Sequence, residues 1–525
     1  MNVLWWQRGI VYQIYPRSFM DSDGDGIGDL AGVRSRLDYL CELGVDALWL
    51  SPIYPSPMKD FGYDVADYTG VDPLFGTLND FDRLVEAAHA RGLKLILDFV
   101  PNHTSDQHPW FIESRSSRQN PKRDWYIWRD KPNNWLSNFG GSAWQLDPAT
   151  GQYYYHAFLA EQPDLNWRNP EVVEAMLGVL RFWLERGVDG FRVDVLWHLM
   201  KDEGFADNPA NPGWCEGMDP YQALVPLHSA DRPEVHGLVR QMRALFDQYG
   251  HRVLIGEIYL PLERLVQYYG ADASGALAGA HLPFNFQLLF VPWEARSLAG
   301  LIAEYERMLP AGAWPNWVLG NHDRPRVATR IGPMQARVAA MLLLTLRGTP
   351  TLYYGDELGM RNVAIPPEAV QDPFERRVPG MGLGRDPVRT PMQWSAAPNA
   401  GFTRGTPWLP VSSDHLTVNV EAQREDATSM LALHKALIAL RRTEPALQVG
   451  RLDLVETVGD VLAYVREDRF LISLNLTNTS QRINVPRAGD IVLSTHLDRA
   501  GEPVAAALHL RPDEGVVLRL KQRHG

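Results

Sequence analysis

The chain has 525 residues and a net charge of −12, from 51 basic and 63 acidic side chains. Hydrophobic residues make up 45% and charged residues 22%, a globular composition that excludes a wholly disordered or fibrous chain. The negative charge disfavours a nucleic-acid partner, because the phosphate backbone carries the same sign.

The sequence also bears on where the protein acts. No run of about 18 apolar residues occurs, so we expect no membrane-spanning helix. The first residues, MNVLWWQRGI, lack the basic and then apolar segments of a signal peptide. Cys41 and Cys215 are too few for a disulfide framework and are expected to be isolated thiols. These features predict a cytoplasmic protein with no membrane partner.

Eight short apolar or β-branched segments alternate with segments of helical spacing. Several, such as Leu93–Phe99, are apolar at consecutive positions, which is typical of strands buried on both faces of a parallel sheet. Between them, Asp80–His89 has its apolar residues on one helical face, and Gly92 ends that helix. The alternation predicts an α/β fold, a (β/α)8 TIM barrel, with a doubly wound open sheet as the alternative. The expected strands are Ile10–Tyr15, Val45–Leu50, Leu93–Phe99, Val188–Val193, Val253–Ile258, Leu282–Phe286, Trp317–Leu319 and Thr351–Tyr354.

Two regions depart from this alternation. Residues 104–169, after the third strand, are rich in Pro, Asn, Gly, Trp and Tyr and are too long for an ordinary loop, which predicts an inserted lobe. From residue 448 to 525 the segments VLAYVR, RFLISLNLT, DIVLSTHL and EGVVLRL alternate as antiparallel strands do, which predicts a C-terminal β-sandwich. The barrel is then formed by residues 1–103 and 170–447.

Carboxylates, histidines and an arginine follow the ends of at least five expected strands. In a parallel barrel these ends converge on one mouth, where active sites lie. A single acidic residue there is usually a cap or a solvated loop residue, but five coincidences predict an active site. The segments are Asp60–Asp64, Asp98–His103, Phe191–Asp194, Gly256–Glu257 and Gly320–Asp323.

With these segments in place, the chain resembles the family 13 glycoside hydrolases (the α-amylase family), in particular their bacterial α-glucosidase and oligo-1,6-glucosidase branch. The resemblance implies a retaining, exo-acting α-glucosidase that releases α-glucose from the non-reducing ends of small α-glucosides. Maltose, isomaltose and related oligosaccharides are the expected substrates, sucrose is a further candidate, and transglycosylation is an expected side activity. The matching segments, in family order, are VYQIYPRSF, GVDALWLSP, DFVPNH, QPDLNW, GFRVDV, GEIY, GNHD, GTPTLYYGDE and RTPMQW.

The resemblance assigns the chemistry to three carboxyl groups. Retaining hydrolysis needs two of them about 5–5.5 Å apart, one as nucleophile and one as acid and base. By motif, Asp194 resembles the nucleophile, Glu257 the acid/base and Asp323 a third carboxylate that stabilises positive charge on the sugar ring. Arg192 points to the same side of its strand as Asp194 and is expected to keep it ionised, whereas the pKa of Glu257 is expected to be raised.

Further residues are assigned to substrate binding by the same resemblance. His103 and His322 would hydrogen-bond to sugar hydroxyls, although a lone histidine is more often structural. Tyr63 would stack under the ring. Phe158 and Gln162, in the inserted lobe, resemble residues that wall the leaving-group side.

The resemblance also bears on exo attack and on linkage. An Asp–Arg pair is expected to close the far end of the first sugar site. Asp60 matches the acid, and Arg389 is the expected partner, with Arg385 as the alternative. Val195, after the nucleophile, is associated with α-1,6 links in the family, although it could equally serve barrel packing. Residues 198–214 depart from the best-known oligo-1,6-glucosidases, which leaves acceptor specificity open.

Residues 21–29, DSDGDGIGD, have the spacing of a calcium loop, with oxygen ligands at alternate positions and Gly at position six. The twelfth position is Gly32, so no bidentate Glu completes an EF-hand. The resemblance implies a structural Ca²⁺ (or Mg²⁺) site, and a solvated acidic turn is the alternative. The expected ligands are Asp21, Asp23, Asp25, the Ile27 carbonyl and Asp29. No organic cofactor is expected.

Two other functions share this fold. One is a disaccharide isomerase or glucosyltransferase, such as a trehalose- or sucrose-rearranging enzyme, which would use the same catalytic residues. The other is a non-catalytic binding subunit, but such proteins are membrane-tethered and lack the carboxylates that this chain retains. The sequence leaves the oligomeric state open.

Overall fold

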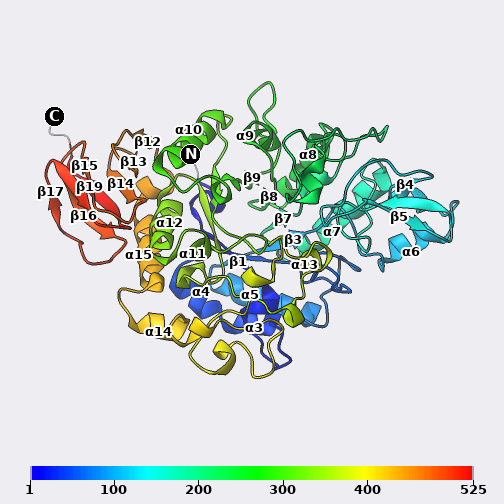
Figure 1. Cartoon of the computed structure of the whole chain (residues 1–525), viewed down its shortest axis with the longest axis horizontal. Coiled ribbons are helices and arrows are strands. Elements are labelled where there is room, and N and C mark those ends of the chain that lie inside the picture. The colour runs from blue at the N-terminus through cyan, green and yellow to red at the C-terminus, as the bar shows by residue number, and fades with distance from the viewer. Residues whose placement is uncertain (1–2, 523–525) are drawn as a thin grey trace.

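The computed structural model describes residues 3–522, and its centre is a parallel sheet of eight strands (Figure 1). The strand order is β10-β11-β1-β2-β3-β7-β8-β9, so the strands follow one another around the barrel in chain order, and only β9 and β10 are not paired within the described residues. This confirms the predicted TIM barrel. The strands are β1 Val11–Ile14, β2 Ala47–Leu50, β3 Lys94–Phe99, β7 Gly190–Val193, β8 Val253–Gly256, β9 Leu282–Pro283, β10 Asn316–Val318 and β11 Thr349–Tyr353.

One side chain links the two strands at the ends of this order, β9 and β10. The Asn316 amide donates a hydrogen bond to the Pro283 carbonyl (2.5 Å), and its oxygen accepts one from the Asn285 N–H (2.8 Å). The expected strand Leu282–Phe286 is therefore much shorter than predicted. Pro283 has no N–H to offer a neighbouring strand, so a side chain completes the ring here.

Helices surround the barrel. Residues 78–90 form the predicted helix, with the Thr77 side chain capping the Asp80 N–H and Asp80 bonding back, and Gly92 adopts a φ of +78° just beyond its end. The helices are α1 Trp5–Arg8, α2 Pro16–Phe19, α3 Leu30–Ser35, α4 Leu37–Leu43, α5 Leu78–Ala90, α7 Pro170–Glu185, α8 Val235–Asp247, α9 Leu262–Leu265, α10 Ala295–Met308, α11 Val327–Arg330, α12 Pro333–Thr345, α13 Pro373–Arg377, α14 Val420–Glu425, α15 Met430–Thr443 and α16 Pro445–Gln448.

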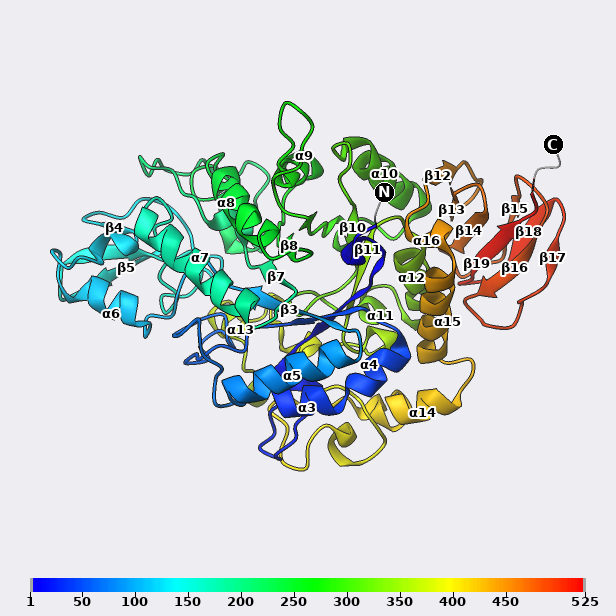
Figure 2. The same ribbon diagram turned by 180° about the vertical axis from the view of Figure 1, so that it is seen from behind.

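The inserted lobe and the C-terminal strands lie on opposite sides of the barrel (Figures 1 and 2). The lobe contains α6 Pro109–Ser116 and a small antiparallel sheet of order β4-β6-β5 (Trp128–Arg129, Gln152–Tyr155, Trp144–Asp147). The C-terminal part has a six-stranded antiparallel sheet and a two-stranded one. Its strands are β12 Leu452–Val455, β13 Val461–Arg466, β14 Phe470–Asn475, β15 Gln481–Asn484, β16 Gly489–Ser494, β17 Pro503–Val504, β18 Ala507–Leu510 and β19 Gly515–Leu520.

Helix α12 joins the barrel to the C-terminal sheet. Nearly all its side chains are buried, as expected for a helix covered on all sides, because it packs against β14, β19 and α15. Polar bonds fix the contact: Thr345 and Tyr464 share a hydrogen bond of 2.6 Å, and the Gln335 amide donates to Asp513 at 2.6 Å. The C-terminal strands are thus anchored to the barrel.

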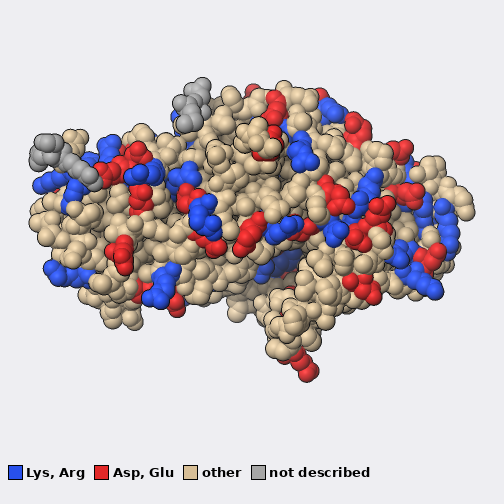
Figure 3. Space-filling model, turned by 90° about the horizontal axis from the view of Figure 1, so that it is seen from above, with Lys and Arg blue, Asp and Glu red and all other residues tan. Residues whose placement is uncertain are grey.

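On the face shown in Figure 3, acidic and basic side chains are interspersed, with no large patch of one sign. None of the helices within residues 3–522 combines the length and the apolar character needed to cross a bilayer. Both cysteines are free, Cys41 half-buried and Cys215 exposed.

Candidate active site

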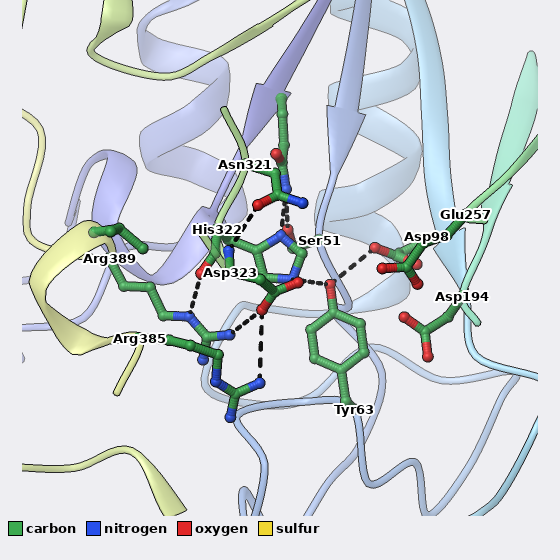
Figure 4. A network of polar contacts seen from close by, with 12 residues as sticks. Ser51, Tyr63, Asp98, Asp194, Glu257, Asn321, His322, Asp323, Arg385 and Arg389 are labelled. Atoms are coloured by element: carbon green, nitrogen blue, oxygen red, sulfur yellow. Dashed lines mark hydrogen bonds and ion pairs between the residues drawn. The ribbon is translucent and has the colours of Figure 1, made fainter. Parts of the chain in front are cut away.

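The barrel brings three carboxyl groups onto one arginine. Arg192 lies in β7 beside Asp98 of β3, its partner in the parallel register. Its guanidinium hydrogen-bonds to Asp98 (2.7 Å) and Asp194 (2.6 Å) and forms an ion pair with Glu257 (2.8 Å). All four side chains are buried. Asp194 and Glu257, far apart in sequence, therefore share one cation. Figure 4 shows these two carboxyl groups close to Asp98.

Burial controls the protonation of this cluster. It raises the pKa of Asp194 and of Glu257, and the charge of Arg192 opposes the rise in both. It also raises the pKa of Asp98 to about 7, again against Arg192. The raised pKa of Glu257 agrees with the prediction. For Asp194, burial and the neighbouring carboxylates raise the pKa, whereas the charge and the hydrogen bond of Arg192 lower it, so the stabilising effect expected of Arg192 is present.

The backbone at Val195 helps to orient Glu257. The Val195 N–H donates a hydrogen bond to the Glu257 carboxylate (2.8 Å). Val195 has a φ of +36°, in the left-handed region that β-branched residues rarely adopt. The residue thus directs its N–H toward Glu257 from a strained backbone and also lines the cavity described below.

Tyr63, His322 and Asp323 form the opposite side of the site in Figure 4. The Tyr63 hydroxyl donates to Asp98 (3.0 Å) and lies 2.7 Å from His322 Nε2, and the two rings stack with centroids 5.3 Å apart. Gln13 Nε2 lies 2.8 Å from His322 Nδ1, so the contacts are satisfied by a neutral ring with its proton on Nε2. Burial holds the pKa of His322 well below its usual value, which agrees with this form.

The third carboxylate, Asp323, is held in its ionised form. Arg389 hydrogen-bonds to it at 2.9 Å, and Arg385 lies 3.6 Å away. Burial alone would raise the pKa of Asp323, but its interactions with His322 and these two arginines lower it. Arg389 also donates to the His322 carbonyl (2.9 Å), so it supports Asp323 from outside the cavity.

The expected pairing of Asp60 with Arg389 is wrong, and Arg385 takes that place. Arg385 hydrogen-bonds to Asp60 at 2.6 Å. A short 3-10 turn over Asp386–Val388 separates the two arginines and sends them to different sides, Arg385 to Asp60 and Arg389 to Asp323. Asp372 also holds Arg385, with its carboxylate accepting from the Arg385 backbone N–H (2.5 Å) and side chain (2.6 Å). No motif or spacing in the sequence pointed to Asp372.

Gln162 also lies elsewhere than predicted. Its amide donates to Asp60 (3.3 Å) and to the Tyr63 carbonyl (3.2 Å), and its oxygen accepts from the Leu159 N–H (3.0 Å). It is fully buried beside the Asp60 end and does not line the cavity. Phe158, in contrast, lines the cavity as expected, and its ring lies 5.3 Å from that of His103.

A buried ion pair anchors the lobe to the barrel mouth. Lys201, in the loop after β7, contacts Asp164 of the lobe at 2.5 Å and donates to Asn102 at 2.7 Å. The Asn102 amide bonds in turn to Asp164 (2.8 Å) and lies 3.1 Å from His103 Nδ1. His103 Nε2 is 2.9 Å from the Tyr63 carbonyl. The lobe, His103 and Tyr63 are therefore fixed together.

These groups surround a cavity of about 700 Å³. It is closed at the Asp60–Arg385 pair, where Asp60 is 4% exposed. The loops after β7 and β11 form its outer walls, through residues such as Trp197 and Phe374. Of the predicted residues, it is lined by Asp60, Tyr63, His103, Phe158, Asp194, Val195, Glu257, His322 and Asp323.

The acidic loop after β1 gathers three of its carboxylates. Oxygens of Asp21, Asp23 and Asp29 lie within 4.8 Å of one another, which suits a hard cation. Asp25, which was also a predicted ligand, does not belong to this group of three. Asp21 accepts hydrogen bonds from the Asp23, Gly24 and Gly26 N–H groups, and Asp29 caps α3 through the Gly32 N–H.

Comparison with known proteins places this site in context. Residues 13–450 match the family model of the alpha-amylase catalytic domain. A probable alpha-glucosidase of Rhizobium meliloti (strain 1021) is 43% identical, over 88% of this chain and 87% of that protein. An oligo-1,6-glucosidase of Parageobacillus thermoglucosidasius is 37% identical, over 99% of this chain and 100% of that protein. The crystal structure of an alpha-glucosyl transfer enzyme, XgtA, superposes with a TM-score of 0.93 at 41% identity, covering 99% of this chain and 100% of that one.

Proposed function

Because the chain belongs to the α-amylase family of glycoside hydrolases, we propose that it is a retaining, exo-acting α-glucosidase of small α-glucosides. The observation that carries the proposal is the placement of Asp194 and Glu257 on one guanidinium beside a cavity closed at one end. Two carboxyl groups in this relation supply a nucleophile and an acid. Asp323, held ionised, would stabilise positive charge on the ring.

The proposed reaction has two steps. In the first, Asp194 forms a bond to the anomeric carbon while Glu257 gives its proton to the glycosidic oxygen, and the C–O bond to the leaving group breaks. In the second, Glu257 takes a proton from water, whose oxygen forms a bond to the anomeric carbon as the ester to Asp194 breaks. Glucose leaves with its α configuration, because each step inverts that carbon.

The charges around Arg192 support Asp194 as the nucleophile and Glu257 as the acid. Three carboxylates on one guanidinium would carry a net charge of −2, so a proton in the cluster near neutrality is favoured. We assign that proton to Glu257, on the oxygen that faces neither Arg192 nor the Val195 N–H. Asp194 then reacts as the carboxylate, with Arg192 2.6 Å away.

The closed end of the cavity supports exo attack. Asp60 and Arg385 would hold the hydroxyls of a terminal glucose, because this buried ion pair lies at one end of the cavity. Tyr63 would stack on that glucose, His103 and His322 would bind its hydroxyls, and Phe158 would wall the leaving-group side. Val195 leaves α-1,6 links among the proposed substrates.

We further propose that the loop after β1 binds a structural Ca²⁺ or Mg²⁺ through Asp21, Asp23 and Asp29. The three gathered carboxylates fit such an ion by the chemistry of their donor set. The Ile27 carbonyl stays a proposed fourth ligand. The ion would stabilise the loop and α3 and take no part in bond cleavage.

The free cysteines support a reducing compartment, and we propose a cytoplasmic location. A second candidate activity is glucosyl transfer, which the similarity to XgtA favours. It would use the same first step, with a sugar hydroxyl in place of water.

A rate panel tests the proposed function. Initial rates and products would be measured on maltose, isomaltose, sucrose and trehalose. We expect free α-glucose as the first product from at least one of them, and a much lower rate for Asp60→Ala at unchanged melting temperature. Products that are rearranged disaccharides with little glucose would favour the isomerase, and cleavage of none of the four would overturn the α-glucosidase.

A further inference from the structure

Arg324 lines the cavity, and its side chain is half-buried. Its guanidinium carbon is 5.2 Å from the ring centroid of Tyr259 and 5.0 Å from that of Phe290. Phe290 is 53% exposed, whereas Asp60 at the closed end is 4% exposed. A terminal glucose held at the buried Asp60 end would place its leaving group away from that end, and Arg324 and Tyr259 line the same cavity.

The aromatic support under Arg324 is fixed by contacts within the barrel. The Tyr259 ring stacks on Phe286 with centroids 4.2 Å apart and an angle of 6°. The Tyr259 hydroxyl accepts a hydrogen bond from the Asn321 amide (2.9 Å), two positions before Asp323. An arginine lying on such a support loses little further freedom when it binds a ligand, so its position is prepared for one.

Within residues 3–522 the Arg324 guanidinium has no hydrogen-bond or ion-pair partner, and its Nε is buried without an acceptor. Other charged groups of the cavity wall are already bound. Glu375, for example, accepts from the Gly380 and Gly384 N–H groups (2.9 and 3.2 Å), and Arg385 is held by Asp60 and Asp372. A buried donor without an acceptor is costly, so a ligand oxygen that accepts from Arg324 would be favoured.

We propose that Arg324 is the residue that selects a polyhydroxylated leaving group, by donating hydrogen bonds to the hydroxyl oxygens of the second sugar. This rests on the proposed α-glucosidase function and names the chemistry of its leaving-group site. A neutral sugar fits better than an anionic aglycone, because Asp194, Glu257 and Asp323 make the cavity rich in carboxylates.

The same contact governs transfer, since transfer to a sugar is the first step in reverse. A sugar held by Arg324 would give its hydroxyl proton to Glu257, and its oxygen would bond to the anomeric carbon as the ester to Asp194 breaks. Losing Arg324 should therefore weaken both cleavage of disaccharides and transfer to sugars, and leave attack by water unaffected.

The test compares two substrates in one variant. Arg324→Met keeps a long side chain over Tyr259 and Phe290 but removes the donors. We expect kcat/KM for maltose to fall at least tenfold and that for phenyl α-glucoside, whose leaving group has no hydroxyl beyond the bond that is cleaved, to change less than twofold. The ratio of transfer to hydrolysis, with glucose as acceptor, should fall as well. Arg324→Lys, which retains charge and donors, should recover part of the maltose rate.

Arg482→Met, an exposed arginine of β15, is the matched control and should leave both substrates unchanged. An equal loss on both substrates by Arg324→Met would show a structural role and overturn the proposal, and so would an unchanged rate on maltose. If the unaltered protein cleaved neither substrate, the α-glucosidase function itself would fail, which is a separate result.

Discussion

Two groups of three acidic side chains lie at the same end of the barrel, and they are held in opposite ways. Asp98, Asp194 and Glu257 gather around the guanidinium of Arg192. Asp21, Asp23 and Asp29 gather in the loop after β1, where, among the described residues, no Lys or Arg forms an ion pair with them and backbone N–H groups bind Asp21.

The difference shows in protonation. Burial raises the pKa of Asp194 and Glu257, so the first group can hold and move a proton. For Asp21 burial has the same tendency, but the Thr403 hydroxyl and the backbone N–H groups outweigh it and lower the pKa. The same residue types thus serve proton transfer in one place and would serve cation binding in the other, and the surroundings decide which.

The largest effect is expected from Asp194→Asn, which keeps the shape of the first group and removes its nucleophile. We expect turnover of a cleaved disaccharide to fall roughly 10⁴-fold, because an amide cannot form the ester. The melting temperature should change little or rise, since one of three mutually repelling carboxylates is gone. Near-normal turnover in the purified variant would refute the assignment.

Lys201→Met tests a third way of holding an acid, in which one buried lysine neutralises one buried carboxylate. Removing the cation leaves the buried Asp164 without a counter-charge, although Asn102 still donates to it, which should cost about 3–5 kcal/mol of unfolding free energy. Chemical denaturation would measure it. The double variant Lys201→Met/Asp164→Asn should recover most of the loss, and an additive loss would contradict the pairing as its cause.

Asp372→Asn probes the closed end of the cavity, where two carboxylates share Arg385. The amide cannot accept from Arg385 as the carboxylate does, so the arginine is held less firmly against Asp60. We expect kcat/KM for maltose to fall roughly 10- to 100-fold. The fall should be mainly in KM, and a kcat loss with unchanged KM would place Asp372 elsewhere in the mechanism.

The sequence predicted the catalytic carboxylates better than it predicted the contacts at the closed end of the cavity. Motifs at strand ends placed Asp194, Glu257 and Asp323 correctly at one cavity, because the barrel itself makes strand ends converge. Asp372 and the choice of Arg385 could not be predicted, since both lie in an irregular segment whose contacts with Asp60 span more than 300 positions. Pairings of this kind depend on loop conformation and not on any periodic pattern.

In the fold, too, regular buried elements could be predicted from the sequence, whereas short or irregular ones could not. The barrel strands were predictable because they are buried on both faces and mostly apolar. In the C-terminal part, β12, β15, β17 and β18 were missed, because these short strands have partly exposed side chains and give weak patterns. The shortness of β9 was missed because the Asn316 side chain closes the gap there, a contact that no periodicity reveals.

The pH dependence of kcat/KM tests whether the carboxyl groups around Arg192 hold and move a proton. As pH falls, Asp194 gains a proton and cannot attack, so kcat/KM should fall through a pKa above the usual value near 3.9. As pH rises, Glu257 loses its proton and cannot protonate the leaving group, so kcat/KM should fall again. With 2,4-dinitrophenyl α-glucoside, whose leaving group needs no proton, Glu257→Gln should keep the acid limb and lose the alkaline one. A rate that stays flat down to pH 4 would contradict the raised pKa of Asp194.

The smallest effect is expected from chelation, which addresses the second acidic group. An ion at a hundredfold excess over its Kd would contribute about 2.7 kcal/mol, so EDTA should lower the melting temperature by a few degrees. The specific activity of the enzyme that stays folded should not change, because the loop takes no part in the chemistry. Asp23→Asn removes a gathered ligand with few other bonds and should abolish the EDTA shift, whereas Asp25→Asn, outside the group, should retain it. If Asp25→Asn abolished the EDTA shift and Asp23→Asn kept it, Asp25 would be a ligand and Asp23 would not, which would contradict the proposed ligand set. If EDTA caused no shift in the unaltered protein, the loop would be a solvated acidic turn that its own backbone hydrogen bonds hold in place.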